Sequence, residues 1–360
     1  MFSQILNTLA FFGADARYYD PGMSLRVAVI GGGSWGTTVA HLAAHNVPTV
    51  LWCRDQAVAK SITESNTNDR YLPGFDLHPS LGASSNLAQV VGQADVVVMG
   101  IPSHAFRAVL DEVKHHIGPS VPVVSLTKGL EHGSKLRMSQ VTEAVLPGHP
   151  AGALTGPNLA KEILAGGAAA SVIAMTDTSI AQELQDVFAI AAFRVYVNND
   201  IVGCEIGGAL KNVIALASGM ADGLGTGDNT RAAIITRGLA ELTRLGVAMG
   251  GEPATLAGLA GMGDVLATCI SPQSRNRHFG EQLGRGKTVD EIAAEMNQVA
   301  EGVKSAPVVL ELGGEYGVDM PIAEQVTRVV SGQATAADAY EELLSRRQGF
   351  ESQPARPAAD

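Results

Sequence analysis

The sequence predicts a two-domain α/β protein in which a doubly wound parallel sheet is followed by an all-α C-terminal domain. The length of 360 residues exceeds the size at which a single core usually stops growing. Short apolar runs alternate with helix-compatible spacers up to about residue 198, and only helical periodicity follows. With 46% hydrophobic and 17% charged residues, the chain has enough apolar material for two cores.

The first domain is predicted from a series of buried-strand candidates. Residues 25–30 form a β-branched run that ends in glycines, and residues 37–45 are compatible with a helix. Residues 49–52 follow where the next strand of a β–α–β unit belongs. Further runs of this kind lie at residues 94–99, 121–126, 170–174 and 193–197. This alternation indicates a mostly parallel sheet.

The second domain is predicted from helical periodicity at residues 205–220, 231–249 and 303–312. We expect the domain boundary near residues 198–203. The expected organisation is an extension without fixed structure (1–24), a dinucleotide-binding domain (25–200), a helical substrate domain (201–345) and a flexible tail (346–360).

Composition limits the class of function. The net charge of −11 disfavours binding to nucleic acid or to an anionic membrane. No run approaches the length of a membrane helix and no signal peptide is visible, so we expect a cytoplasmic protein without membrane insertion. The three cysteines fit a reducing compartment, and neither they nor the histidines have metal-ligand spacing, so no metal is predicted. No serine-hydrolase or catalytic-cysteine motif is present.

A GxGxxG motif, made by Gly31, Gly33 and Gly36, lies between the first predicted strand and helix. In that context the glycines allow a tight turn, and backbone N–H groups at the helix N-terminus face a pyrophosphate. The alternative is an ordinary structural turn. The motif favours a Rossmann-type domain that binds NAD or NADP. Arg54 follows the second strand and would tolerate the 2′-phosphate of NADP, unless it is only a solvated loop residue.

Lys211 is the one charged residue in the apolar segment 206–220, so a helix there should bury it. An unpaired buried ammonium costs several kcal/mol unless it is paired or gives up its proton. Such a lysine can exchange a proton near neutral pH. A structural ion pair with a buried carboxylate is the alternative. Gly207 and Gly208 suggest that a ring or another backbone approaches this turn closely.

Two segments offer cations for a phosphate. Lys128 follows a predicted strand at the sheet edge where ligands bind, and residues 271–277 combine hydroxyls, an amide and two guanidiniums. A solvated basic loop is the alternative for the second segment. Residues 261–264 form a glycine-containing turn, and residues 156–158 form another that closes a further predicted strand; ordinary turn chemistry accounts for each of them alone.

Taken together and in order, these segments resemble the bacterial-type NAD(P)-dependent glycerol-3-phosphate dehydrogenases over residues 25–344. The matching segments are GGGSWGTTVA from Gly31, NTNDRYLPG from Asn66, IPSHAFR from Ile101, SLTKGLE from Ser125, TGPNLAKEI from Thr155, EIGGALKNVIALASG from Glu205, GDNTRAAIITRGLAEL from Gly227, GMGDVLATC from Gly261, SRNRHFG from Ser274 and VAEGVKS from Val299.

The resemblance implies hydride transfer between a nicotinamide and C2 of dihydroxyacetone phosphate or sn-glycerol 3-phosphate. It places the acid/base at Lys211 and an orienting carboxylate at Asp264, with Arg275 as the main phosphate clamp. The implied substrate contacts are Lys128, Gly156, Asn158, Lys211, Asp264, Ser274, Arg275 and Asn276. The implied cofactor contacts are the glycine motif with Ser34, Trp35, Arg54, Lys128, Ala160, Arg275, Val299 and Glu301.

The resemblance also implies a homodimer that supplies glycerol 3-phosphate for phospholipid synthesis. Asn158 departs from the pattern, because many relatives have serine or threonine there. Two other functions stay open at this point. One is a related two-domain β-hydroxyacid-type dehydrogenase, and the other is a non-catalytic NAD(P)H sensor in which Lys211 is only structural.

Overall fold

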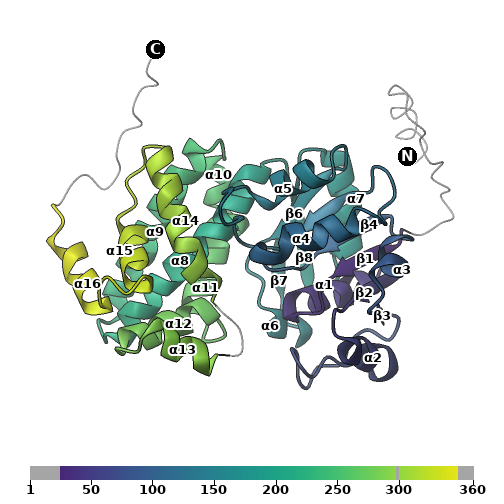
Figure 1. Ribbon diagram of the computed structural model, residues 1–360, viewed down its shortest axis with the longest axis horizontal. Coiled ribbons are helices and arrows are strands. Elements are labelled where there is room, and N and C mark those ends of the chain that lie inside the picture. Colours follow the sequence, from purple (N-terminus) through teal and green to yellow (C-terminus); the bar gives the residue numbers. More distant parts are fainter. Residues whose placement is uncertain (1–24, 297–299, 348–360) are drawn as a thin grey trace, which may run out of the picture.

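The computed structural model describes residues 25–296 and 300–347, which form a sheet-containing half and a helical half (Figure 1). Within these residues one sheet has the strand order β3-β2-β1-β4-β5-β6-β7-β8. Neighbouring strands are parallel except β6 and β7, which pair antiparallel. The strands are β1 (Val27–Ile30), β2 (Thr49–Trp52), β3 (Gly82–Ser84), β4 (Val96–Met99), β5 (Val123–Ser125), β6 (Ala151–Thr155), β7 (Ala169–Met175) and β8 (Phe193–Asn198).

Helices cover both faces of the sheet because successive apolar side chains point to opposite sides. In β1, Val27 and Val29 pack into one layer, and Ala28 and Ile30 pack into the other. The first layer contains α1 (Ser34–Ala44), α2 (Gln56–Ser65), α6 (Ala160–Leu164) and α7 (Thr178–Phe188). The second contains α3 (Leu87–Val91), α4 (Ser103–Val113) and α5 (Met138–Val145).

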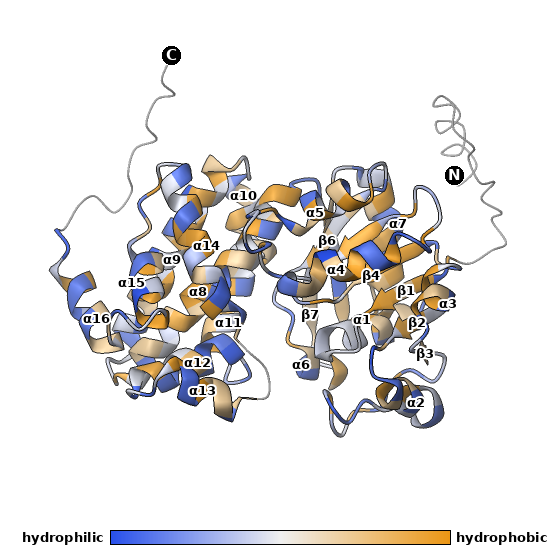
Figure 2. Ribbon diagram, viewed as in Figure 1, coloured by the Kyte–Doolittle hydropathy of each residue, from blue (hydrophilic) through white to orange (hydrophobic). Residues whose placement is uncertain are grey.

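The helical half is built around α8 (Ile201–Gly223), which is buried along most of its length. Its apolar side chains form a core with those of the surrounding helices, whose ribbons carry both orange and blue residues in Figure 2. The other helices are α9 (Asp228–Ala248), α10 (Pro253–Leu256), a π-helical turn (Leu259–Gly263), α11 (Asp264–Ile270), α12 (Arg275–Gly284), α13 (Val289–Glu295), α14 (Glu301–Glu315), α15 (Pro321–Val330) and α16 (Ala336–Ser345).

One expectation from the sequence needs correction. By length and mean hydropathy, α8 and the segment Pro253–Ile270 do reach the values of a membrane-spanning helix. The most apolar window of α8 is 89% buried inside the protein, because neighbouring helices cover it. Its apolar composition is therefore accounted for by the core of the helical half.

The mostly parallel sheet followed by helices is confirmed. The strand predicted at residues 49–52 matches β2, whereas those predicted at 25–30, 94–99 and 121–126 are shorter in the structure. β3 was not predicted, because its small, half-buried residues form no apolar run. Residues 1–24 and 348–360 lie outside the described part of the chain. The predictions of an N-terminal extension and a C-terminal tail therefore stay predictions for these residues.

Candidate active site

The glycine motif lies at the carboxyl end of β1, where β2 pairs on one side and β4 on the other. Gly31 has a φ of +121°, and a Cβ there would lie 2.5 Å from the carbonyl oxygen of Gly100. A Cβ on Gly36 would lie 2.1 Å from the carbonyl oxygen of Gly31, whereas one on Gly33 would meet nothing within 4 Å. Gly31 and Gly36 therefore allow close packing, and Gly33 leaves the N-terminus of α1 open. This arrangement fits the pyrophosphate of a dinucleotide.

A segment between α2 and β3 braces this loop. The side-chain amide of Asn68 donates to the carbonyl oxygen of Gly32 at 3.0 Å and to Thr37 Oγ1 at 2.9 Å. Ser34 Oγ donates to the carbonyl oxygen of Tyr71 at 3.1 Å. Asn68 was missed by sequence reasoning, although it lies in the NTNDRYLPG segment that carries the resemblance. The indole N–H of Trp35 is buried without a partner in the described part of the chain, which suits a group that meets a ligand.

A carboxylate flanked by two lysines forms the centre of the second cluster. Lys211 Nζ, from α8, lies 2.6 Å from Asp264 Oδ1 at the start of α11. Lys128 Nζ, beyond the end of β5, lies 2.7 Å from Asp264 Oδ2. All three side chains are largely buried, with 9%, 2% and 13% exposure for Lys211, Asp264 and Lys128. The sheet and the helical half therefore meet at one carboxylate.

Among the described residues, each of the two ammonium groups keeps one N–H for a ligand. An ammonium has three donors. Lys211 uses two of them, toward Asp264 and toward Thr268 Oγ1 at 2.9 Å. Lys128 also uses two, toward Asp264 and toward the carbonyl oxygen of Gly156 at 2.7 Å. Within residues 25–296 and 300–347 the third N–H of each amine has no protein acceptor, so both amines can bind an oxygen of the substrate.

Burial shifts the pKa values of two groups in and beside this cluster, Lys128 and Glu301. It lowers the pKa of Lys128 to about 8, and nearby Lys211 acts in the same direction while Asp264 opposes it. Burial also raises the pKa of Glu301, the first residue of α14, against the opposing charges of Arg275, Lys211 and Lys128. The cations therefore lie close enough to interact. They outnumber the carboxylates, which suits a phosphorylated substrate in a chain of net charge −11.

The adjacent glycines Gly207 and Gly208 of α8 permit close contacts with two different neighbours. A Cβ on Gly207 would lie 2.6 Å from the carbonyl oxygen of Ala260, so another backbone does approach this turn. A Cβ on Gly208 would lie 3.3 Å from Thr155 Oγ1 and 3.5 Å from Lys128 Cγ. Thr155 Oγ1 is buried without a hydrogen-bond partner in the described residues, as is Asn158 Oδ1. Thr155 Oγ1, which lies beside Gly208 as Lys128 does, is therefore placed to serve a ligand there.

The predicted phosphate segment divides into residues with different partners. Ser274 Oγ caps α12 by accepting from the backbone N–H of Arg277 at 3.2 Å. Asn276 joins a chain of amides, donating to Asn212 Oδ1 at 2.9 Å and accepting from Gly302 N at 2.9 Å. The expectation of two phosphate-binding guanidiniums is wrong for Arg277, because Asp222 of α8 engages both its Nε at 2.9 Å and its Nη2 at 2.7 Å, and its Nη1 faces Glu281 at 4.0 Å. Arg275, at the first turn of α12, remains the candidate clamp.

The other predicted site positions are Gly156, Ala160, Arg54 and Val299. Gly156, with φ +137°, has the backbone conformation that favours glycine and supplies the carbonyl oxygen that Lys128 contacts. Ala160 begins α6, and exposed Arg54 follows β2. Val299 lies outside the described residues. Sequence reasoning missed Thr268, whose position one helical turn after Asp264 was the available signal.

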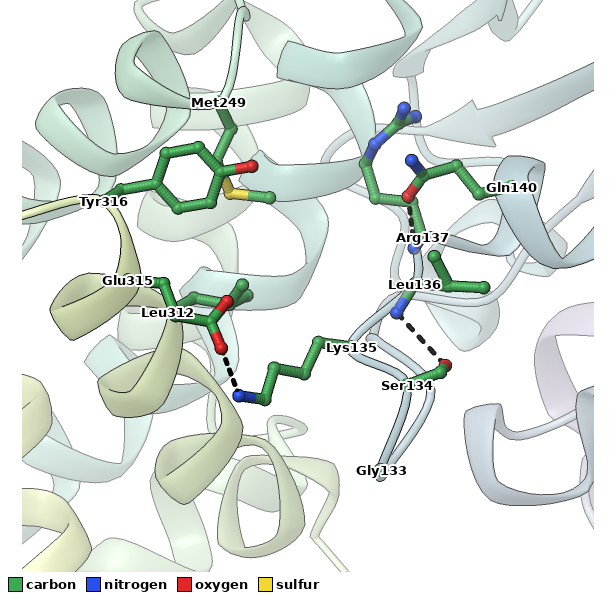
Figure 3. Close-up of a pocket in the computed structure, with 10 residues that line it drawn as sticks. All are labelled: Gly133, Ser134, Lys135, Leu136, Arg137, Gln140, Met249, Leu312, Glu315 and Tyr316. Atoms are coloured by element: carbon green, nitrogen blue, oxygen red, sulfur yellow. Dashed lines mark hydrogen bonds and ion pairs between the residues drawn. The ribbon is translucent and has the colours of Figure 1, made fainter.

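A separate cavity lies between residues 133–137 and the far end of α14, and Figure 3 shows Lys135 reaching across it to Glu315. Lys135 Nζ lies 2.9 Å from Glu311 and 2.5 Å from Glu315. Nearby, Arg137 Nη1 lies 2.6 Å from buried Glu205 of α8. None of the predicted site residues lines this cavity, so it is distinct from the lysine–carboxylate cluster. Its ion pairs join the two halves of the molecule.

Comparison with known proteins adds independent information. A family model described as the NAD-dependent glycerol-3-phosphate dehydrogenase N-terminus matches residues 26–181. The model of the corresponding C-terminus matches residues 200–341.

Similar proteins include glycerol-3-phosphate dehydrogenase (NAD(P)+) 2 of Sphingopyxis alaskensis, 58% identical over 92% of this chain and 100% of that protein. Glycerol-3-phosphate dehydrogenase (NAD(P)+) 1 of Mycobacterium tuberculosis is 53% identical over 91% of this chain and 96% of that protein. A crystal structure of glycerol-3-phosphate dehydrogenase from Coxiella burnetii superposes with a TM-score of 0.86 at 35% identity, covering 90% of this chain and 99% of that one.

Proposed function

Because the chain belongs to the NAD-dependent glycerol-3-phosphate dehydrogenase family, we propose that Lys211 is the acid/base of its reaction. The chain is an NAD(P)-dependent oxidoreductase that interconverts dihydroxyacetone phosphate and sn-glycerol 3-phosphate. The bound nicotinamide supplies or accepts the hydride at C2 of the substrate. The chain must bind the phosphate, orient the carbonyl and move one proton. Neither the β-hydroxyacid-type alternative nor the sensor is supported by these relatives.

The observation that carries the proposal is the contact of Lys211 with Asp264 and Thr268 inside a buried cluster. During reduction the remaining N–H of Lys211 donates its proton to the C2 oxygen as negative charge develops there. Asp264 accepts a hydrogen bond from Lys211 throughout and orients the amine. Thr268 fixes the same amine from a second direction. In oxidation the steps run in reverse, and the neutral amine accepts the proton.

We further propose that Lys128, Arg275 and Asn276 hold the phosphorylated substrate, together with Gly156, Asn158 and Ser274. Support comes from the excess of cations around Asp264 and from the buried oxygens of Thr155 and Asn158, which have no hydrogen-bond partner in the part of the chain that the structure describes. For the cofactor we propose the glycine motif with Ser34, Trp35, Arg54, Ala160 and Glu301. Val299 is proposed from the family resemblance alone.

The division at residues 200 and 201 is also a proposal. Three boundaries support it: β8 ends at Asn198, α8 starts at Ile201, and the second family model starts at residue 200.

We likewise propose that the protein is a cytoplasmic homodimer that supplies glycerol 3-phosphate for phospholipids. Cys53, Cys204 and Cys269 are unpaired and buried, in keeping with a reducing compartment. Light scattering of the purified protein tests the dimer.

The proposed role of Lys211 is tested by following NADPH absorbance with dihydroxyacetone phosphate as the only added substrate. Lys211→Ala should lower turnover by about 100-fold or more while NADPH binding persists, because the proton donor is lost and the glycine loop is intact. Lys287→Ala is the matched control, since Lys287 pairs with Glu295 at the surface. Unchanged turnover of Lys211→Ala would remove the assignment and favour a structural ion pair with Asp264.

A further inference from the structure

Recognition of the adenosine ribose depends on the residues that follow β2. In sheets of this type an acidic residue near this point binds the ribose 2′-hydroxyl of NAD, whereas a cation accommodates the 2′-phosphate of NADP. Arg54 and Asp55 follow β2 in this chain, one of each kind in adjacent positions. The preference for a cofactor therefore depends on which of the two side chains is available to it.

Both carboxylate oxygens of Asp55 are already engaged. Oδ1 caps α2 by accepting from the backbone N–H of Ala57 at 2.8 Å. Oδ2 accepts from Arg70 Nη1 at 2.5 Å. The ion pair balances the charge of the carboxylate, and the cap fixes its direction. Asp55 is thereby withdrawn from the role that an acidic residue has in NAD recognition.

Arg70 is held at this place by its neighbours along the chain. Asn68, two residues before it, donates to the glycine loop at Gly32 and Thr37. Tyr71, the residue after it, accepts from Ser34 at the start of α1. The Arg70 guanidinium also lies 5.4 Å from the centre of the Tyr71 ring. Arg70 is therefore anchored between the loop that fits the pyrophosphate and the end of β2.

We infer that Arg70 is a second cation of a 2′-phosphate subsite, beside Arg54, and that its ion pair with Asp55 directs the chain toward NADP(H). Two guanidiniums and one carboxylate leave a net charge of +1 at the end of β2. A guanidinium has five N–H donors, and Asp55 contacts only Nη1 of Arg70, so the group can hold a phosphate oxygen as well. Without Arg70, the Asp55 carboxylate would repel the 2′-phosphate. This inference rests on the proposed cofactor site.

The test is the binding of each cofactor to an Arg70→Gln variant, measured by nicotinamide fluorescence without substrate. We expect the Kd for NADPH to rise about tenfold or more, because a charge-assisted contact is lost and a carboxylate is uncovered. The Kd for NADH should change by less than about twofold, or fall as Asp55 becomes available to the ribose hydroxyl. Adenosine 2′,5′-bisphosphate should likewise lose affinity about tenfold as a competitor, whereas adenosine 5′-monophosphate should not.

Lys60→Gln is the matched control. Lys60 lies on α2, its side chain is 69% exposed, and its partner is Glu64 at 3.9 Å. The substitution removes the same charge from the same region and should leave both Kd values within about twofold. A loss of NADPH affinity as large as that of Arg70→Gln would assign the effect to general surface charge and overturn the inference.

The outcomes separate this inference from the proposed function. If the unmodified protein binds both cofactors and Arg70→Gln weakens them equally, or weakens neither, the 2′-phosphate role of Arg70 is wrong and the dehydrogenase site stands. If the unmodified protein binds neither cofactor, the cofactor site itself is misassigned, and the role of Arg70 is overturned with it.

Discussion

Replacing Asp264 with asparagine removes a negative charge from between two buried ammonium groups, and the cost of this change should depend on pH. The amide oxygen of Asp264→Asn can replace the acceptor for Lys211, which leaves the amide N–H groups facing Lys128. Lys128 can accommodate them only as a neutral amine, which accepts a hydrogen bond. We therefore expect Lys128 in the variant to be neutral at pH 7.

The magnitude follows from the pKa of Lys128, which burial lowers to about 8 in the folded protein. Removing a proton from such a group at pH 7 costs about 1.4 kcal/mol. At pH 9 the folded protein already holds Lys128 mostly neutral, so this cost disappears. Because the folded pKa lies below the unfolded value of 10.5, protein stability rises with pH between about 8 and 10.5. In the variant the rise begins at lower pH, so the difference between the two proteins shrinks from pH 7 to pH 9.

Urea unfolding at pH 7 and pH 9 measures this difference directly. Asp264→Asn should be about 1.4 kcal/mol more destabilising at pH 7 than at pH 9. Asp222→Asn is the matched control, since Asp222 pairs with Arg231 and Arg277, whose guanidiniums keep their charge over this range. A cost of Asp264→Asn that is equal at the two pH values, or larger at pH 9, would refute the reasoning about Lys128.

Three further predictions follow from individual contacts. The value of kcat/KM should fall about tenfold per pH unit above pH 8 as Lys128 loses its charge, and Lys128→Arg should flatten that limb of the pH–rate profile. Glu205→Ala should lower the free energy of unfolding by about 3 to 5 kcal/mol, because it leaves the largely buried Arg137 guanidinium without its carboxylate partner at the junction of the two halves. Denaturant unfolding measures this loss, and a value below about 1 kcal/mol would contradict the prediction. Burial raises the pKa of the Glu241 carboxyl from 4.5 to about 7. The free energy of unfolding should therefore fall by about 3 kcal/mol as the pH rises from 4.5 to 7, because the folded state keeps the carboxyl protonated. Thermal unfolding of Glu241→Gln should lack this fall, since the variant has no carboxyl to titrate.

Much of the fold was predictable because the strands that form the centre of the sheet are buried on both faces. Such strands appear as continuous apolar runs rich in β-branched residues, as in β1 and β4. The antiparallel pairing of β6 with β7 has no such signature, since a strand buried on both faces has the same composition in either direction. Direction is decided by the connection, which crosses α6 and a loop whose path the residues alone do not specify.

The candidate site was predictable where one residue contrasts with its surroundings. Lys211 stands out in an apolar helix, and its burial is observed. Its two partners come from α11, more than 50 residues further along the chain, and the sequence pattern does not determine which carboxylate approaches. Arg277 was misjudged for the same reason, because its pairing with Asp222 depends on how α12 packs against α8. Contacts between distant helices are set by packing, and composition alone does not specify them.

The direct test of the central claim is the rate of hydride transfer in a single turnover, measured by rapid mixing of enzyme-bound NADPH with excess dihydroxyacetone phosphate. This measurement excludes product release and so reports on the step in which the proton moves. Lys211→Met should slow that step by about 100-fold or more, with binding of NADPH retained. A rate within about threefold of that of the unmodified protein would show that another group donates the proton.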